Sequence, residues 1–137
     1  MKAAPLAALI LLSACSVEEW PEREEIASAV ESDDFRQLQA SVADVELLGG
    51  EATCLSAGDD ARAGNAAAVP DSTTFRLMRS VGVQKLCIEV SGSVDYVWQS
   101  DWEDQRGVYH FAPSDSLTLL GDNSEDWGGG LVYYSTL

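Results

Sequence analysis

Nucleophilic catalysis in this 137-residue chain would have to use its single histidine, His110, or one of its three cysteines. A serine or cysteine nucleophile needs a neighbouring base, and histidine is the usual one. His110 alternates with Tyr109 and Phe111 in a segment typical of a β-strand, and no Gly-x-Ser-x-Gly elbow surrounds any serine. Neither Cys54 nor Cys87 belongs to a Cys-x-x-Cys motif. We therefore expect a structural or surface histidine, no catalytic residue and no enzyme.

The stretch from 122 to 128, Asp-Asn-Ser-Glu-Asp-Trp-Gly, places oxygen ligands at alternate positions, as a calcium loop does. Its sixth position is Trp127, where such a loop needs glycine, and its twelfth is Tyr133 instead of glutamate. Two cysteines and one distant histidine are also too few for a usual zinc site. We predict no metal site and no cofactor.

Tryptophan stands among acidic residues at two places, Trp102 in Asp-Trp-Glu-Asp and Trp127 in Glu-Asp-Trp-Gly. Both places are predicted to be loops. An exposed indole beside carboxylates can stack on a sugar ring or anchor a protein partner. The alternative is that both indoles fold back over a sheet edge. Our hypothesis is that Trp102 and Trp127 bind a partner.

The first 14 residues are typical of a secretory signal peptide. Lys2 supplies the positive charge, and the apolar run from 3 to 12 is too short to span a bilayer core of about 30 Å. Small residues precede the expected cleavage point.

The run ends in Leu12-Ser13-Ala14-Cys15, which resembles the lipobox of bacterial lipoproteins. The resemblance implies cleavage before Cys15, a diacylglyceryl thioether on its sulfur and acylation of the new amino group. Two or three acyl chains would give lasting membrane attachment. Ser16 stands where aspartate is the usual inner-membrane retention signal, which favours an outer-membrane anchor facing the periplasm.

Once Cys15 is assigned to lipid, Cys54 and Cys87 remain as an even pair in an oxidising compartment. We predict a disulfide between them. They lie 33 residues apart, and closing a loop of that size stabilises a domain by roughly 3–4 kcal/mol in the chain-entropy model.

The composition is strongly acidic, with 23 Asp and Glu against 8 Lys and Arg and a formal charge of −15. Removing the signal peptide takes away Lys2 and no acid, so the remainder is one unit more negative. Phosphates would repel this chain, which excludes nucleic acid and anionic lipid surfaces as partners. The acids either form a solvated surface or attract a cationic partner.

Two short helices are predicted between 22 and 43, with a single bent helix as the alternative. Pro21 and the acids after it suit a helix start. The pattern then breaks, and Ser32 or Asp33 can cap a second helix, whose apolar residues continue from Phe35 at helical spacing. A third helix of about ten residues should follow residue 70 and end at a glycine at 82.

The remaining segments are predicted to be β structure. Residues 113–126 are taken as a loop with at most a short strand at 117–120. A first strand is interrupted by a Gly-Gly pair that forms either a turn or a bulge. The expected strands are 45–55, 86–90, 94–98, 107–112 and 131–135.

Helices in the first half and strands in the second indicate an α+β fold, with the helices packed on an antiparallel sheet of about four strands. Residues 1–14 are the signal peptide, 15–21 the lipidated N-terminus and spacer, and 22–137 a single domain. The expected function is that of a lipid-anchored envelope lipoprotein, a non-enzymatic binding or structural module whose partner is an envelope protein or cell-wall component.

Two alternatives remain open. The size, lipid anchor, disulfide and negative charge are similar in format to those of periplasmic lysozyme inhibitors, whose targets are strongly basic. No motif of those inhibitors matches this chain, and their all-β barrel differs from its helical first half. The second alternative is an enzyme acting on wall or lipid substrates, which would need His110 paired with a carboxylate.

Overall fold

The computed structural model describes residues 21–45, 47, 50–57, 72–101, 104–115 and 123–136. Cys15 and Trp102 lie outside the described residues. The described helices are α2 (Arg23–Val30), α3 (Asp33–Ala43) and α4 (Ser72–Val81), and the strands are β1 (Thr53–Ser56), β2 (Lys85–Ile88), β3 (Val94–Ser100), β4 (Gln105–His110), β5 (Ser124–Gly128) and β6 (Leu131–Ser135).

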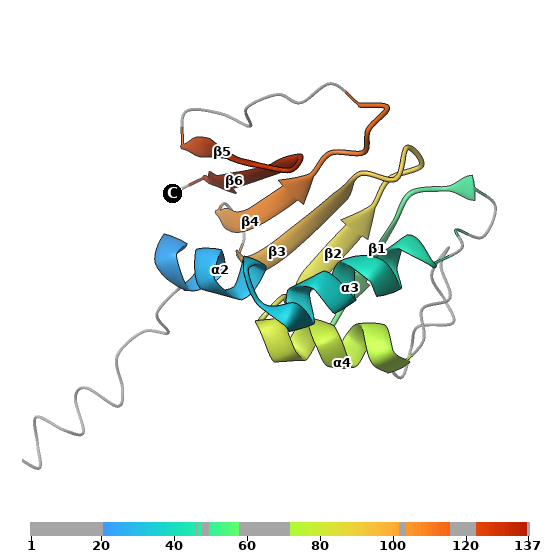
Figure 1. Cartoon of the computed structure of the whole chain (residues 1–137), viewed down its shortest axis with the longest axis horizontal. Coiled ribbons are helices and arrows are strands. Elements are labelled where there is room, and N and C mark those ends of the chain that lie inside the picture. The colour runs from blue at the N-terminus through green and yellow to red at the C-terminus, as the bar shows by residue number, and fades with distance from the viewer. Residues whose placement is uncertain are drawn as a thin grey trace, which may run out of the picture.

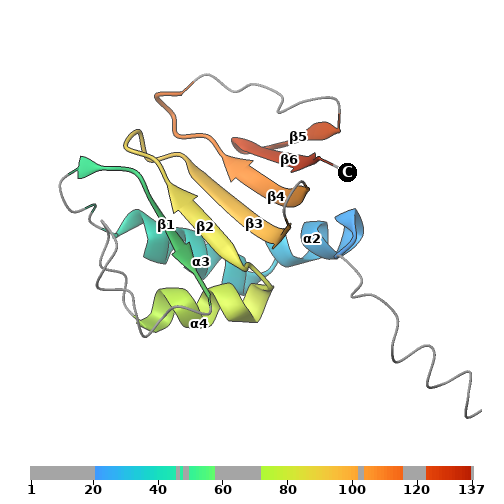
Figure 2. The same ribbon diagram turned by 180° about the vertical axis from the view of Figure 1, so that it is seen from behind.

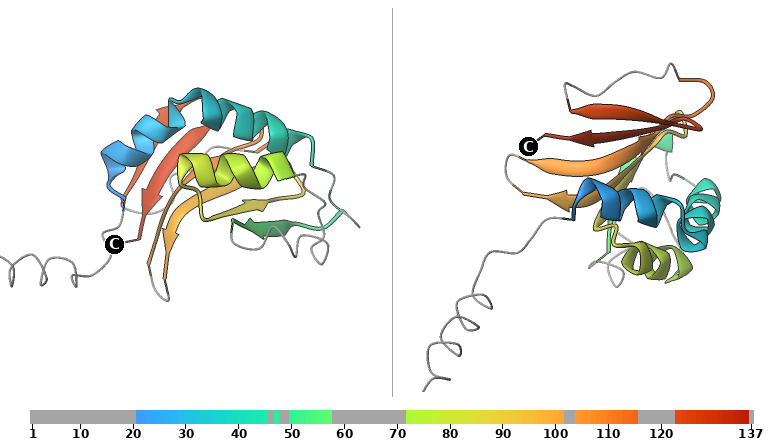
Figure 3. Two further views of the ribbon diagram at one scale, coloured as in Figure 1. Left: turned by 90° about the horizontal axis from the view of Figure 1, so that it is seen from below. Right: turned by 60° about the vertical axis from the view of Figure 1, so that its left-hand side comes forward.

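The strands form one antiparallel sheet in the order β1-β2-β3-β4-β6-β5. Helices α3 and α4 lie side by side on one face of this sheet, and α2 continues the helical layer toward β5 and β6 (Figure 1). Seen from behind, the opposite face carries none of the described helices (Figure 2). The sheet curves under the helices (Figure 3). The α+β prediction is confirmed.

The predicted number of about four strands is wrong, because the sheet has six. The strand that the sequence hides is β5, whose Ser-Glu-Asp-Trp-Gly lies mostly in the segment predicted to be a loop. Its side chains do not alternate between apolar and polar. It pairs with β6 through the backbone and forms a sheet edge, where one face and one side remain open to water.

Two helices, and not one bent helix, occupy the first segment. Ser32 is the N-cap of α3, where its Oγ accepts a hydrogen bond from the Phe35 amide at 3.2 Å and donates to the Ala29 carbonyl at 2.6 Å. The same serine therefore closes α2 and opens α3. This join directs Ile26 and Phe35, both fully buried, toward the sheet.

Helix α4 ends at Gly82, as predicted. Gly82 has φ 88°, and the amides of Gly82 and Val83 bond back to the carbonyls of Arg79 and Met78 in a Schellman motif. The reversed chain leads directly into β2. Phe75 and Met78 on α4 are buried in the core.

The core lies between the helices and the sheet. The Phe35 ring packs edge-on against Tyr96, with centroids 5.0 Å apart, and stacks on Trp98 at 5.9 Å. Trp98 is buried and donates its indole N–H to the Val81 carbonyl at 2.9 Å. One aromatic cluster therefore joins α3, α4 and β3.

The predicted disulfide between Cys54 and Cys87 is confirmed. The two residues are directly opposite each other in the β1–β2 register. Their neighbours Leu55 and Leu86 are buried in the core, so by strand alternation the disulfide lies on the face away from the helices. It fastens the edge strand β1 to the sheet.

Candidate partner-binding site

The prediction that Trp127 lies in a loop is wrong, since it lies in β5. Its indole stacks on the Tyr133 ring of β6, with centroids 5.0 Å apart and an interplanar angle of 8°. The Arg23 guanidinium lies 5.6 Å from the Trp127 ring centroid, in cation–π range. Trp127 is therefore half-buried and packs against the core.

Arg23, the first residue of α2, also binds Glu125 with two guanidinium nitrogens, one of them Nη2 at 2.9 Å from Oε1. This pair lowers the pKa of the Glu125 carboxyl. The contact fixes the start of α2 to the sheet edge. Trp127 thus has a structural role that its sequence context did not reveal, and its role as a partner-binding residue stays a prediction, as does that of Trp102.

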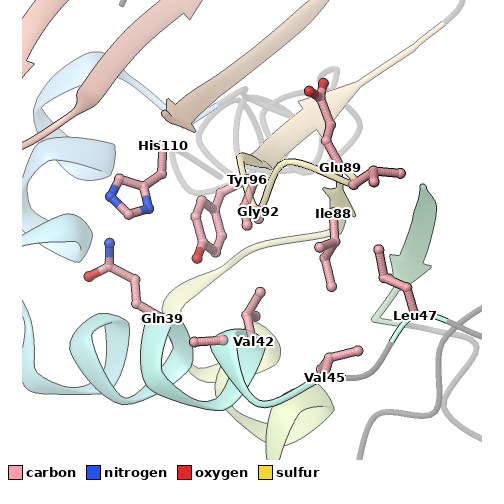
Figure 4. A pocket seen from close by; sticks show the side chains of 12 residues that line it. Gln39, Val42, Val45, Leu47, Ile88, Glu89, Gly92, Tyr96 and His110 are labelled. Atoms are coloured by element: carbon pink, nitrogen blue, oxygen red, sulfur yellow. The ribbon is translucent and has the colours of Figure 1, made fainter. Parts of the chain in front are cut away.

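A pocket of about 340 Å³ lies where α3 ends against the sheet (Figure 4). We call it the α3-end pocket. It is lined from the helix side by Gln39, Val42, Ala43, Val45 and Leu47, and from the sheet side by Ile88, Glu89, Val90, Gly92, Val94, Tyr96 and His110.

The turn between β2 and β3 forms the outer wall of this pocket. The Glu89 amide bonds the Ser93 carbonyl at 2.8 Å, and Gly92, at φ 95°, supplies the positive φ that the turn requires. Val90 projects from this turn with 68% of its surface exposed. No other large apolar residue among those described is so exposed.

Asp115 holds the turn in place. Its Oδ2 accepts hydrogen bonds from the Ser93 and Ser91 hydroxyls, the latter at 2.7 Å, and these bonds lower the pKa of the Asp115 carboxyl. Ser93 is fully buried, and its Oγ also accepts the Ala112 amide at 2.8 Å. Strands were predicted at 86–90 and 94–98, but the role of Ser91 and Ser93 in holding the turn between them was not. Two serines around a glycine were the available signal of a side-chain-bonded turn.

His110 lines the pocket from β4, with its ring beside Gly130 and facing the Gln39 amide across the pocket (Figure 4). The histidine is half-buried. Glu89 is the one carboxylate among the described lining residues, and in Figure 4 its side chain points away from His110. The two polar side chains at this end of the pocket are suited to hydrogen bonding with a bound group.

The helix-free face carries a second polar cluster, centred on Asp95. The register places Asp95 directly opposite Cys87 on β2 and Tyr109 on β4. The Tyr134 hydroxyl donates to Asp95 Oδ1 at 2.8 Å, and Gln105 donates to that hydroxyl. Burial raises the pKa of the Asp95 carboxyl, against the lowering effect of the Tyr134 bond.

Gly107 explains how Tyr134 reaches Asp95. A Cβ at Gly107 would clash with the Tyr96 carbonyl and lie 2.9 Å from the Tyr134 hydroxyl. The missing side chain lets the ring lie flat over β4. This cluster is a satisfied structural network, because each polar group named here has a partner.

The described ranges hold no group of three or more His, Cys, Asp or Glu side chains placed to bind a metal ion. None of the described helices has the length and apolar character needed to cross a bilayer. No match to this chain was found among known protein families, curated proteins or solved structures.

Proposed function

We propose that this chain is a small lipid-anchored lipoprotein of the bacterial envelope whose single α+β domain is a non-enzymatic binding module. The observation that supports binding most strongly is the α3-end pocket, an apolar hollow with hydrogen-bonding groups at one end. Such a combination is the usual character of binding pockets in proteins.

The position of the pocket agrees with anchoring. Pro21, the first described residue, precedes α2 at one end of the helical layer, whereas the pocket lies beyond the C-terminus of α3 at the other end (Figure 1). A tether at Cys15 would enter the domain at the α2 end. The pocket would then remain accessible to a partner while lipid holds the protein at the membrane.

Charge favours a second candidate within the same class, an inhibitor of a cationic wall-degrading enzyme such as lysozyme. The formal charge of −15 would attract such a target through complementary fields. An enzyme acting on wall or lipid substrates is not favoured, because His110 faces Gln39 across the pocket while the Glu89 side chain points away from it.

Two measurements test the proposal. Metabolic labelling with a fatty-acid probe should mark the wild-type protein and not Cys15→Ser, which should accumulate as an unprocessed or mislocalised precursor. Labelling of the Cys15→Ser protein would show that Cys15 is not the lipid attachment site. Purification from cross-linked envelopes should recover a specific protein or wall fragment, and recovery of the domain alone would contradict a binding role.

A further inference from the structure

We infer that the α3-end pocket binds a partner polypeptide segment that presents an apolar side chain next to lysine or arginine. This inference deepens the proposed binding function and rests on it. It assigns the site and the chemistry of the partner, neither of which follows from the lipid anchor.

The apolar part of the argument comes from the lining. Val42 and Val45 face Ile88 across the pocket, Leu47 closes one side, and Val94 also belongs to the lining. Apolar surface continues out of the pocket onto Val90, which is 68% exposed on the rigid β2–β3 turn. A pocket joined to an exposed apolar rim suits a side chain that projects from a larger partner surface, because the rim can pack against the partner's neighbouring atoms.

The charge part of the argument comes from which side chains surround the mouth. Among the described residues that line the pocket there is no lysine or arginine. The Glu89 side chain points out of the pocket, and its carboxylate bonds with the Tyr109 hydroxyl. Asp44, between the lining residues Ala43 and Val45, is exposed. Asp115 adds a third carboxylate behind the turn.

Four of the five described arginines bond to groups that do not line the pocket. Arg23 binds Glu125 and Arg36 binds Asp33, while Arg106 donates to the Pro21 carbonyl at 2.9 Å and Arg79 to the Ala57 carbonyl at 3.2 Å. The pocket mouth is therefore locally acidic on a molecule that is acidic as a whole. Electrostatic complementarity selects a basic partner and disfavours an acidic one.

His110 and Gln39 favour a polypeptide segment for a further reason. The imidazole and the carboxamide face each other at one end of the pocket, and the carboxamide offers both a donor and an acceptor. Backbone N–H and C=O groups beside the inserted side chain can bond to them. A purely apolar ligand would leave both groups without a partner.

The test uses the exported protein purified from cells and three acetylated, amidated peptides. The first is Lys-Leu-Lys-Phe-Lys, the second has glutamate in place of each lysine, and the third has serine in place of leucine and phenylalanine. The first should bind at least about tenfold more tightly than either of the others. Its NMR shift changes should cluster on residues 39–47, 88–94 and 110.

Ala43 offers a matched pair of variants, because it lines the pocket and is exposed at the end of α3. Ala43→Lys should bind the basic peptide at least about fivefold more weakly than Ala43→Glu does, since the two side chains are of similar length and differ in charge. Lysine suits a helix C-terminus better than glutamate does, so weaker binding by Ala43→Lys would not arise from an unstable helix.

Several results would overturn the inference. Equal binding of the acidic and basic peptides would show that charge does not select the partner. NMR shift changes confined to the surroundings of Trp127 would show that the peptide binds there and not in the α3-end pocket. Tighter binding of the neutral dye N-phenyl-1-naphthylamine than of the basic peptide, with the same shifts, would assign the pocket to a small apolar ligand. If Ala43→Lys still captures the envelope partner as well as the wild type does, the α3-end pocket is not the partner site, although the domain still binds a partner.

Discussion

At the scale of single residues, Trp127 shows how one contact changes the meaning of a sequence context. The two acids before Trp127 suggested an exposed anchor, but Arg23 contacts both Glu125 and the indole, and the Tyr133 ring stacks on that indole. The acids beside Trp127 therefore belong partly to the contact that fixes α2. A ring held in this way contributes to stability before it contributes to any interface.

Trp127→Ala should lower the free energy of unfolding by about 2–3 kcal/mol, because it removes a half-buried ring together with its stacking contact on Tyr133. Trp127→Phe should lose less than half of this, since a ring remains on Tyr133. Urea denaturation measures both, with Val90→Ala as an exposed control expected to change stability by less than about 0.5 kcal/mol. Unchanged stability with lost partner capture would instead support Trp127 as an interface anchor.

Asp95 gives a prediction for pH. Burial raises its pKa above the unfolded value of 3.8, so the folded state holds the proton more tightly. The resulting stabilisation is complete below pH 3.8 and is lost as the pH rises through the folded pKa. Asp95→Asn keeps an acceptor for the Tyr134 hydroxyl. At pH 7 this variant should therefore raise Tm by a few degrees, which corresponds to about 1 kcal/mol in the free energy of unfolding.

The difference in Tm between Asp95→Asn and the wild type should shrink as the pH falls through the folded pKa toward 3.8, and it should stay small below 3.8, where both side chains are neutral. Glu125 and Asp115, whose lowered pKa values act in the opposite direction, are present in both proteins and cancel. Asp95→Ala should be destabilised at every pH, because it leaves the Tyr134 hydroxyl without its acceptor. A difference in Tm that stays constant between pH 3 and 7 would contradict a raised pKa for Asp95.

At the scale of elements, the sequence predicted those helix ends and strands that are set by residues close together in the chain. Ser32 indicated the break between α2 and α3, Gly82 the end of α4, and alternation the strands β2 and β3. Strand β5 was not predicted, because its place in the sheet depends on backbone pairing with β6 and not on a pattern of its own side chains.

The α3-end pocket could not be predicted for a related reason. Its lining comes from α3, the β2–β3 turn and β4, and local spacing does not say which of these segments meet. His110 was expected to be a structural or surface residue, and its place opposite Gln39 follows only from the packing of α3 on β4. Long-range packing, and not residue type, creates the site.

The disulfide makes an element-scale prediction. Reduction should lower the free energy of unfolding by about 3–4 kcal/mol, and the edge strand β1 should lose protection first because Cys54–Cys87 fastens it to β2. Hydrogen exchange should show faster exchange of β1 amides in reductant than of β3 and β4 amides. The Cys54→Ala/Cys87→Ala variant should match the reduced protein and no longer respond to reductant. Uniform acceleration across all strands would show that β1 does not unfold separately.

At the scale of the whole molecule, charge dominates. The negative charges that give a formal charge of −15 repel one another across a small domain. The pairs of Arg23 with Glu125 and of Arg36 with Asp33 lie at exposed sites, where ion pairs contribute little to stability. Salt therefore acts on two quantities with opposite signs. It screens the repulsion within the domain, and it also screens the attraction between the domain and a basic partner.

Raising NaCl from about 10 mM to about 300 mM shortens the Debye length from about 30 Å to less than 8 Å. Over this range Tm should rise by about 3–6 °C, a gain of roughly 1 kcal/mol, because repulsion among the acids weakens. Binding of the Lys-Leu-Lys-Phe-Lys peptide should weaken at least about tenfold over the same range. Choline chloride at equal ionic strength should have the same effects if screening, and not a bound sodium ion, is responsible. A fall in Tm would show that the Arg23 and Arg36 ion pairs outweigh net repulsion, and salt-independent binding would mean that the pocket captures its partner through apolar contact alone.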